Sequence, residues 1–367
     1  MRNNENMSQR SHNSATTQPR IGVIGAGHLG RIHAKLIAAN PACRFIGVAD
    51  PSIDSRRIIE SQLNVAAVAD YREWLGEIDG AIIAAPTFLH HQIGAWCLNN
   101  GIHVLMEKPI ASSPKEASQL VQLANAKERT LQVGHVERFN PAWQLALSRF
   151  SSDAVRYIEA AREGTYTGRS TDIGIVMDLM IHDIDLVLST VQSPVDSISA
   201  FGWSVLGEHE DFATACLRFR NGTIANLRAS RIASIQKREM QVYADDGLTE
   251  INFATNTVNH TSAVDDVANS SRQADRLPPE LRAKVKDSLY VDWLNKVESK
   301  AEASNAILCE QTEFVDAIRS GTPVTVTGEH GYQALEVAAR ILEQIAINRP
   351  VRAIIPAAAR FGQTKAA

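Results

Sequence analysis

The stretch IGVIGAGHLGRIHAKL, residues 21–36, decides the fold of the first part of the chain. An apolar run is followed at once by Gly25, Gly27 and Gly30 in the spacing GxGxxG, and then by apolar residues at helical spacing. In such a strand–turn–helix unit the first glycine permits a tight turn, the second lets the backbone approach a pyrophosphate, and the third lets the helix pack closely on the strand. The stretch therefore predicts a loop that binds the phosphates of a dinucleotide.

An acid follows this loop at the position that a dinucleotide requires. Asp50 stands twenty residues after the last glycine, at the end of the next apolar run. Its carboxylate would accept hydrogen bonds from the adenosine ribose, while the helix amides of His28 and Leu29 would face the pyrophosphate. Because a carboxylate repels a 2′-phosphate, Asp50 favours NAD over NADP, although the nearby Arg56 and Arg57 could reverse that preference. A Walker-type phosphate loop is excluded, since its Lys-Ser/Thr ending is absent.

The same alternation of apolar runs and helical spacing continues along the first part of the chain, and it indicates a parallel sheet covered by helices. We expect an α/β Rossmann domain, a doubly wound parallel sheet, over residues 20–141, after a disordered polar tail at residues 1–19. The predicted strands are residues 21–24, 45–49, 81–84, 103–106 and 131–133.

After about residue 150 the pattern changes to antiparallel signals. Asn221-Gly222 and Asp246-Gly247 each separate two apolar runs, and both pairs tolerate the positive φ of two-residue hairpin turns. We expect residues 142–367 to form a second α/β domain with a mainly antiparallel open sheet that binds substrate and mediates oligomerisation. One helix is predicted near residues 279–297 and two more between residues 310 and 345.

Composition limits the partners and the compartment. The net charge is −4 and no cluster of Lys and Arg marks a face, so nucleic acid is not an expected partner. No stretch approaches the ~20 apolar residues that span a membrane, and the first residues lack the apolar core of a signal peptide. The four cysteines include no CxxC pair, which suits free thiols in a reducing compartment. We therefore expect a cytoplasmic protein without a membrane partner.

Several polar residues fall where strands of the predicted parallel sheet end. In open α/β sheets, ligands bind beyond the carboxyl ends of the strands. Pro86 and Thr87 follow one predicted strand, and Glu107 and Lys108 follow the next. Lys108 is thus expected to project toward the nicotinamide, although a solvated lysine at a strand exit is the alternative reading.

A second group of polar residues interrupts the apolar residues 175–188. Asp178, His182 and Asp185 are spaced to share one face of a helix, which should line a cleft because buried charges are costly. The alternatives are a stripe that faces water and a metal site, but no further His or Cys has ligand spacing, so no metal is expected. His182 could accept a hydroxyl proton with Asp178 orienting its ring, and Lys108 could bond the same hydroxyl oxygen.

Five motifs in this order resemble the glucose-fructose oxidoreductase, inositol dehydrogenase and rhizopine catabolism (Gfo/Idh/MocA) family. They are "GAGHLGRIHAKL", "AAPTFLHH", "EKPI", "VGHVERFNP" and "DLMIHDIDLVL". The resemblance runs from residue 20 to about residue 345 and implies a Rossmann domain followed by an α/β domain whose open sheet mediates dimers or tetramers. It also implies that the catalytic residues are Lys108, Asp178 and His182.

The resemblance assigns further residues to the cofactor and the substrate. Pro86, Thr87 and His90 match a family stretch beside the cofactor, and Arg138, Asn140 and Pro141 match a segment that crosses between the domains. Within the family, "QVGHVERFNPA" and "MIHDIDLVL" are most similar to the branch that oxidises the 3-hydroxyl of UDP-N-acetylglucosamine in making amino-substituted lipid A precursors. Residues that would then help to bind substrate are Arg162, Arg169 or His135. One departure, "DIGIVMD" in place of a family "GGG" before the Asp, leaves the choice of sugar open.

We therefore expect an NAD-dependent dehydrogenase that acts on a secondary hydroxyl of a nucleotide sugar. A second enzymatic reading is an inositol or free-sugar dehydrogenase with the same three catalytic residues. The reading from another class is a non-catalytic NAD-binding regulator, against which the presence of Lys108, Asp178 and His182 argues.

Overall fold

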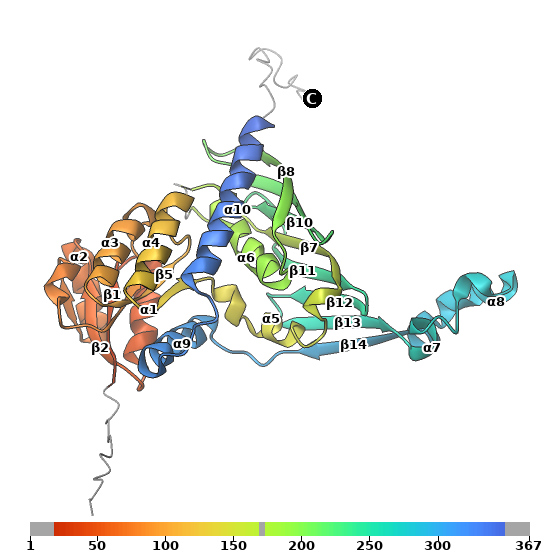
Figure 1. Cartoon of the computed structure of the whole chain (residues 1–367), viewed down its shortest axis with the longest axis horizontal. Coiled ribbons are helices and arrows are strands. Elements are labelled where there is room, and N and C mark those ends of the chain that lie inside the picture. The colour runs from red at the N-terminus through yellow and green to blue at the C-terminus, as the bar shows by residue number, and fades with distance from the viewer. Residues whose placement is uncertain (1–17, 169–172, 349–367) are drawn as a thin grey trace, which may run out of the picture. The chain divides into compact units, whose positions relative to one another are not determined.

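The computed structural model describes residues 18–168 and 173–348, which fall into two units (Figure 1). The first unit contains the chain up to Phe139 together with Ser304–Tyr332. The second contains Asn140–Ala303 and the chain from Gln333 onward. Every residue after 141 was expected in the second domain, whereas residues 304–332 pack in the first unit.

The first unit is built on a six-stranded parallel sheet in the order β3-β2-β1-β4-β5-β6, the doubly wound arrangement that was predicted. Its strands carry continuous apolar runs because helices cover both faces. The strands are β1 Arg20–Ile24, β2 Arg44–Ala49, β3 Ala66–Val68, β4 Gly80–Ile83, β5 His103–Glu107 and β6 Leu131–Gly134. The helices of this unit are α1 His28–Ala38, α2 Ile53–Leu63, α3 Thr87–Asn99, α4 Pro114–Ala126 and α9 Ala306–Ser320.

Consecutive residues of β5 point to opposite faces of the sheet and contact the two helical layers. Leu105 lies in a core with Phe314 of α9 and Ile37 of α1. Met106 faces the other side, where its methyl group lies near Gly94 of α3. Helix α4 begins after Ser113, whose hydroxyl accepts a hydrogen bond from the Glu116 amide.

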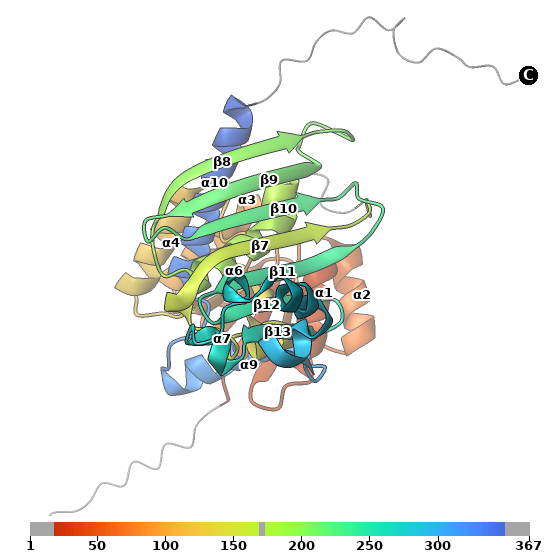
Figure 2. The same cartoon turned by 90° about the vertical axis from the view of Figure 1, so that its right-hand side faces the viewer.

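The second unit is built on an eight-stranded sheet in the order β14-β13-β12-β11-β7-β10-β9-β8, in which only β7 and β10 pair in parallel (Figure 2). The strands are β7 Val155–Glu163, β8 Val195–Trp203, β9 Phe212–Phe219, β10 Ile224–Ser230, β11 Lys237–Ala244, β12 Gly247–Asn252, β13 Thr257–Ala263 and β14 Leu294–Lys300. The helices are α5 Pro141–Ala146, a π-turn at Val176–Met180 that continues into α6 Ile181–Thr190, α7 Asp265–Ala268, α8 Pro279–Lys284 and most of α10 Gly328–Ile347.

One face of this sheet packs against α5, α6 and α10 around a core that includes Trp143, Phe219 and Leu227. The opposite face carries exposed side chains such as Phe201, Trp203 and Tyr243. The mainly antiparallel open sheet that was predicted is therefore present, with helices on one side.

Both predicted hairpins are present. The Asn221-Gly222 pair lies between β9 and β10, and Gly222 has φ +90°, but the Phe219 amide donates to the Thr223 carbonyl oxygen, so the loop has three residues instead of the predicted two. The other loop is shifted by one residue, because Ala244 pairs with Gly247 and leaves Asp245 and Asp246 as the two loop residues.

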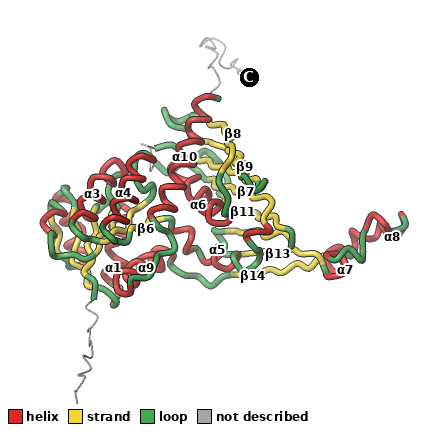
Figure 3. The backbone as a smooth tube through the Cα atoms, in the orientation of Figure 1, coloured by secondary structure: helices red, strands yellow, loops and turns green. Residues whose placement is uncertain are grey.

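The prediction for residues 279–297 was wrong. Helix α8 ends at Lys284, and β14 begins at Leu294 and pairs with β13. The segment with α7 and α8 extends away from the sheet between these strands (Figure 3). Across residues 18–168 and 173–348, no helix combines the length and the apolarity that a membrane span needs.

Candidate active site

The glycine loop between β1 and α1 is shaped as the GxGxxG spacing predicts. Gly25 has φ +101°, a left-handed conformation that favours glycine. A Cβ on Gly30 would lie 1.9 Å from the Gly25 carbonyl oxygen, so this residue has to be small for α1 to pack on β1. A Cβ on Gly27 would instead meet no atom within 4 Å. The loop is therefore tightly packed against the protein at Gly25 and Gly30, whereas space remains beside Gly27.

The open side of the loop is the start of α1. The helix begins at His28, followed by Leu29, and its cap residue Gly27 supplies no side-chain hydrogen bond. The first amides of a helix attract anions, and a glycine without neighbours leaves room for them to approach. These residues fit the pyrophosphate of a dinucleotide.

Asp50 ties this loop to the end of β2. Its carboxylate accepts hydrogen bonds from the Ala26 amide at 2.7 Å and the Ser52 amide at 2.8 Å. Arg56 donates to the Asp50 and Pro51 carbonyl oxygens at 2.8 and 3.0 Å. The carboxylate thus lies beside the phosphate loop, where it would accept ribose hydroxyls and repel a 2′-phosphate.

The loops after β4 and β5 are joined by His90. Helix α3 begins at Thr87 with Pro86 as its cap residue, and His90 follows in its first turn. The His90 ring nitrogens lie 2.9 Å from the Pro109 carbonyl oxygen and 2.8 Å from the Ala85 carbonyl oxygen. Burial lowers the pKa of His90, although both carbonyl oxygens act to raise it. His90 therefore holds together the two strand exits that carry Thr87 and Lys108.

Glu107, expected among the cofactor-binding residues, contacts the interior of the first unit. Its Oε1 lies 2.7 Å from His33 Nε2, and its Oε2 accepts the Lys108 amide at 3.2 Å. Burial raises the pKa of Glu107, but the His33 hydrogen bond and the Lys108 charge outweigh burial and lower it. The buried Glu310 of α9 has its pKa raised well above the ordinary value, because burial and the charges of Glu107 and Glu313 act together. Glu107 thus fixes the backbone at Lys108 from beneath.

Lys108 directly follows the last residue of β5 and is half-buried. Because all six strands run in parallel, the ends of β1, β2, β4 and β5 meet at one edge of the sheet. The glycine loop, Asp50, Thr87 and Lys108 therefore share the edge at which ligands of such sheets bind.

The other two predicted catalytic residues lie in the second unit. Asp178 is in the π-turn and His182 is in the first turn of α6, and both side chains are half-buried. Asp185 was expected on the same face, but it is only 1% exposed because α6 packs against β7 and β10. Of the three residues predicted to share one face, Asp178 and His182 are thus half-buried and Asp185 is buried.

Two of the residues suggested for substrate binding are buried, and the third lies outside the described residues. Arg162 is 4% exposed and pairs with Asp183 at 2.8 Å, with the Phe253 ring 5.7 Å away. This ion pair places the Arg162 guanidinium against α6. His135 is 1% exposed in the first unit, and Arg169 is not described.

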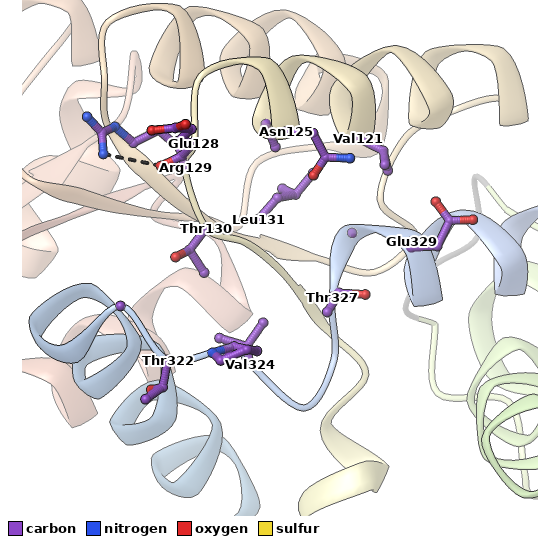
Figure 4. Close-up of a pocket in the computed structure, with 14 residues that line it drawn as sticks. Val121, Asn125, Glu128, Arg129, Thr130, Leu131, Thr322, Val324, Thr327 and Glu329 are labelled. Carbon is purple, nitrogen blue, oxygen red and sulfur yellow. Dashed lines mark hydrogen bonds between the residues drawn. The ribbon is translucent and has the colours of Figure 1, made fainter.

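A cavity of about 430 Å³ lies at the opposite edge of the parallel sheet (Figure 4). It is lined by the end of α4, the start of β6 and the segment from Gly321 to Glu329. Arg129 lines it and donates to the Glu128 carbonyl oxygen at 3.3 Å. This cavity faces the amino ends of the strands, so it is separate from the edge that carries the glycine loop.

In the described part of the chain, no group of three or more His, Cys, Asp or Glu residues could hold a metal ion.

Comparison with known proteins identifies the family. Residues 19–135 match the profile of the oxidoreductase family with an NAD-binding Rossmann fold, Gfo/Idh/MocA, and residues 146–250 match a C-terminal domain of the same family. UDP-N-acetylglucosamine 3-dehydrogenase of Acidithiobacillus ferrooxidans is 33% identical over 325 residues, which is 88% of this chain and 96% of the relative. Myo-inositol 2-dehydrogenase of Thermotoga maritima is 24% identical over 86% of this chain and 93% of the relative.

Solved structures agree with this assignment. The structure of the Acidithiobacillus enzyme superimposes with a TM-score of 0.78 at 29% identity, over 90% of this chain and 98% of that chain. Levoglucosan dehydrogenase, in complex with NADH and levoglucosan, shares the fold with a TM-score of 0.74 at 18% identity, over 90% of this chain and 98% of that chain. The chain belongs to the Gfo/Idh/MocA family of NAD-binding oxidoreductases.

Proposed function

We propose that this protein oxidises a secondary hydroxyl of a nucleotide sugar with NAD, and that its substrate is UDP-N-acetylglucosamine, oxidised at the 3-hydroxyl. The observation that carries this proposal is the 33% identity to UDP-N-acetylglucosamine 3-dehydrogenase over nearly the whole length of both chains. The geometry of the first unit supports it, because Lys108 follows the strand end beside an open glycine loop and Asp50.

When bound, NAD would supply the hydride acceptor for the proposed reaction. Gly25, Gly27 and Gly30 would let the helix amides approach its pyrophosphate, and the Asp50 carboxylate would accept hydrogen bonds from its ribose hydroxyls. Lys108 donates a hydrogen bond to the reacting oxygen and stabilises its developing negative charge. His182 accepts the hydroxyl proton, and Asp178 orients its ring and stabilises the imidazolium that forms.

The decisive experiment incubates the protein with NAD and a panel of UDP-sugars, inositols and free sugars, and follows NADH by absorbance. Bound cofactor is measured first by releasing it from denatured protein, so that a tightly held nicotinamide does not hide turnover. Turnover with UDP-N-acetylglucosamine, lost in Lys108→Ala, supports the proposal. Turnover with myo-inositol alone favours the second candidate, for which the similarity to the Thermotoga inositol dehydrogenase argues. NAD binding without turnover on any panel member would favour a regulator.

We further propose a cytoplasmic homodimer or homotetramer formed through the open face of the eight-stranded sheet. The exposed aromatic residues on that face support this assembly: Phe201 is 40% exposed and Trp203 is 57% exposed. A role in making amino-substituted lipid A precursors follows from the proposed substrate. Light scattering of the purified protein and of a Trp203→Glu variant tests the assembly, because a charge there should lower the mass to that of the monomer.

A further inference from the structure

The helix that carries Asp178 and His182 takes its cap from a distant part of the chain. Neither the π-turn nor α6 has a side-chain hydrogen bond from its own cap residue. Glu210, in the loop between β8 and β9, instead accepts the Val176 amide at 3.1 Å with Oε1 and the Ile175 amide at 3.0 Å with its carbonyl oxygen. Glu210 is 9% exposed. One buried residue thus satisfies two amides that a helix start leaves without partners.

Gly174 leaves the space that the Glu210 carboxylate occupies. A Cβ on Gly174 would lie 2.0 Å from Glu210 Oε1, so the position has to be glycine for the carboxylate to reach Val176. The Gly174 carbonyl oxygen accepts the Asp178 amide at 3.0 Å. Glu210 therefore fixes the backbone of residues 174–176, and the hydrogen bond from Asp178 to Gly174 connects that backbone to Asp178.

The loop that carries Glu210 is itself anchored. The neighbouring Asp211 is fully buried, and its carboxylate accepts Arg231 Nε and the amides of Val205 and Leu206, each at 2.6 Å. Arg231 also donates to the Ile173 carbonyl oxygen at 3.0 Å. Arg231 thus joins the loop to Ile173, the residue before Gly174. The Asp211–Arg231 ion pair therefore holds both the loop that carries Glu210 and the segment that leads into the helix.

We propose that Glu210 is a positioning residue for the reaction, which holds the π-turn so that Asp178 and His182 face the substrate together. The inference rests on the proposed function, because it needs these two residues to act in turnover. A π-turn is a rare geometry that recurs at functional sites, and without an anchor the segment would relax toward a regular helix. Without the anchor, the Gly174 carbonyl oxygen that accepts the Asp178 amide would no longer be fixed, so the Asp178 backbone would shift relative to His182.

The test compares variants at Glu210 with a control in the same loop. Glu210→Ala should lower kcat about tenfold while the dissociation constant for NAD stays within about twofold, because the glycine loop and Asp50 belong to the other unit. Glu210→Gln keeps the oxygen that accepts the Val176 amide, so its kcat should stay within about threefold of the wild type. The exposed Glu208→Ala should leave every parameter unchanged. If Glu210→Ala does not fold, Glu210→Asp withdraws the carboxylate by one methylene and should show the same fall in kcat.

A double-mutant cycle with Gly174→Ala tests whether a side chain at position 174 displaces the Glu210 carboxylate. Gly174→Ala should displace the Glu210 carboxylate and lower kcat by the same factor as Glu210→Ala, and the double variant should be no worse than either single variant. Wild-type kcat in Glu210→Ala with only a lowered Tm, a Gln variant as impaired as the Ala variant, or multiplying effects in the double variant would overturn the proposal.

Hydrogen exchange of the Val176 amide separates this inference from the proposed function. The amide should exchange slowly in the wild type and in Glu210→Gln and rapidly in Glu210→Ala, with or without turnover. A wild type that oxidises no sugar would refute the proposed function, whereas unchanged exchange in Glu210→Ala would refute the anchoring by Glu210.

Discussion

The two helix starts that carry the site residues each follow a glycine and differ in the atoms that lie near that glycine. At the start of α1 a Cβ on Gly27 would find no atom within 4 Å, whereas at the start of the π-turn a Cβ on Gly174 would find the Glu210 carboxylate at 2.0 Å. A helix start attracts negative charge in both cases. In the first unit that attraction is left for the phosphates of a ligand, and in the second a carboxylate of the protein already satisfies it. A glycine at a helix start therefore indicates a close approach, and only the surrounding chain shows whether ligand or protein makes it.

The largest expected effect tests whether each region supplies a catalytic group. Lys108→Ala and His182→Ala should each lower kcat by ~10² to 10⁴, because the alanine variants lose the cation at the reacting oxygen and the proton acceptor. NAD binding, measured by fluorescence titration, should persist in both variants. Turnover within about threefold of the wild type in either variant would contradict the catalytic assignment of that residue.

The next prediction concerns the buried ion pair between Arg162 of β7 and Asp183 of α6, the helix that follows the π-turn. Arg162→Met should lower the free energy of unfolding by about 3 to 5 kcal/mol, because it removes the positive charge that forms an ion pair with the buried Asp183. The matched control is Arg228→Met, which removes an ion pair with Glu163 from a side chain that is 42% exposed and should cost less than about 1 kcal/mol. Urea unfolding followed by circular dichroism measures both, and equal losses would show that the Arg162 pair is not protected from solvent.

A smaller effect tests whether the space at Gly27 belongs to the ligand. Gly27→Ala should weaken NAD binding at least about tenfold, or about 1.4 kcal/mol, because its methyl group occupies the approach of the pyrophosphate. The Tm without NAD should hardly change, since no atom lies near that methyl group. Gly30→Ala is the contrasting variant, which should lower the Tm because its Cβ would lie 1.9 Å from the Gly25 carbonyl oxygen. Unweakened NAD binding in Gly27→Ala would remove the contrast between the two helix starts.

The smallest effect concerns pH and His103, the first residue of β5. Burial and the nearby Arg129 charge lower the pKa of His103 to about 4, and its Nδ1 accepts the Thr130 amide at 3.0 Å. Between that pKa and the unfolded value of about 6.5 the unfolded chain binds more protons, so this contribution to stability is present above pH 6.5 and is lost as the pH falls toward 4.

His103→Gln keeps an oxygen that can accept the Thr130 amide and removes the titration. The loss of unfolding free energy between pH 7 and pH 5 should therefore be smaller in the variant by about 1 kcal/mol, a value reduced for the partial exposure of the ring. Urea unfolding at the two pH values measures the difference. Equal losses in both proteins would assign the acid sensitivity to other groups.

The parallel sheet was predictable because its signals are local. Each predicted strand of the first unit appears, since a strand covered on both faces is a continuous apolar run between helices. The short strand Ala66–Val68 was missed because three residues carry no period. The place of α9 was also missed, because the pattern of an amphipathic helix does not show which core its Phe314 enters.

The second unit contains strands and contacts that local sequence patterns do not predict. The hairpin turns could be predicted from residues that tolerate positive φ, whereas β13 and β14 are largely solvated strands without regular alternation, and their polar sequence was taken in part for a helix. At the site, the roles of Lys108, Asp178 and His182 stay predictions. Glu210 was missed because its partner Val176 lies 34 residues earlier, and nothing in "GEHEDF" marks an acid as a helix cap.

The return of residues 304–332 to the first unit has a consequence for the order of synthesis. His33 and Gln311, whose side chains lie 2.7 Å apart, are separated by 278 positions, and Phe314 shares a core with Ile21 and Val23. A ribosome therefore releases the whole second sheet before it releases the helix that completes the nucleotide-binding half. Although domains usually fold in the order of their emergence, here the half that begins first is completed later. A nascent chain that has emerged only through Phe139 lacks that helix and is the species that chaperones would be expected to hold.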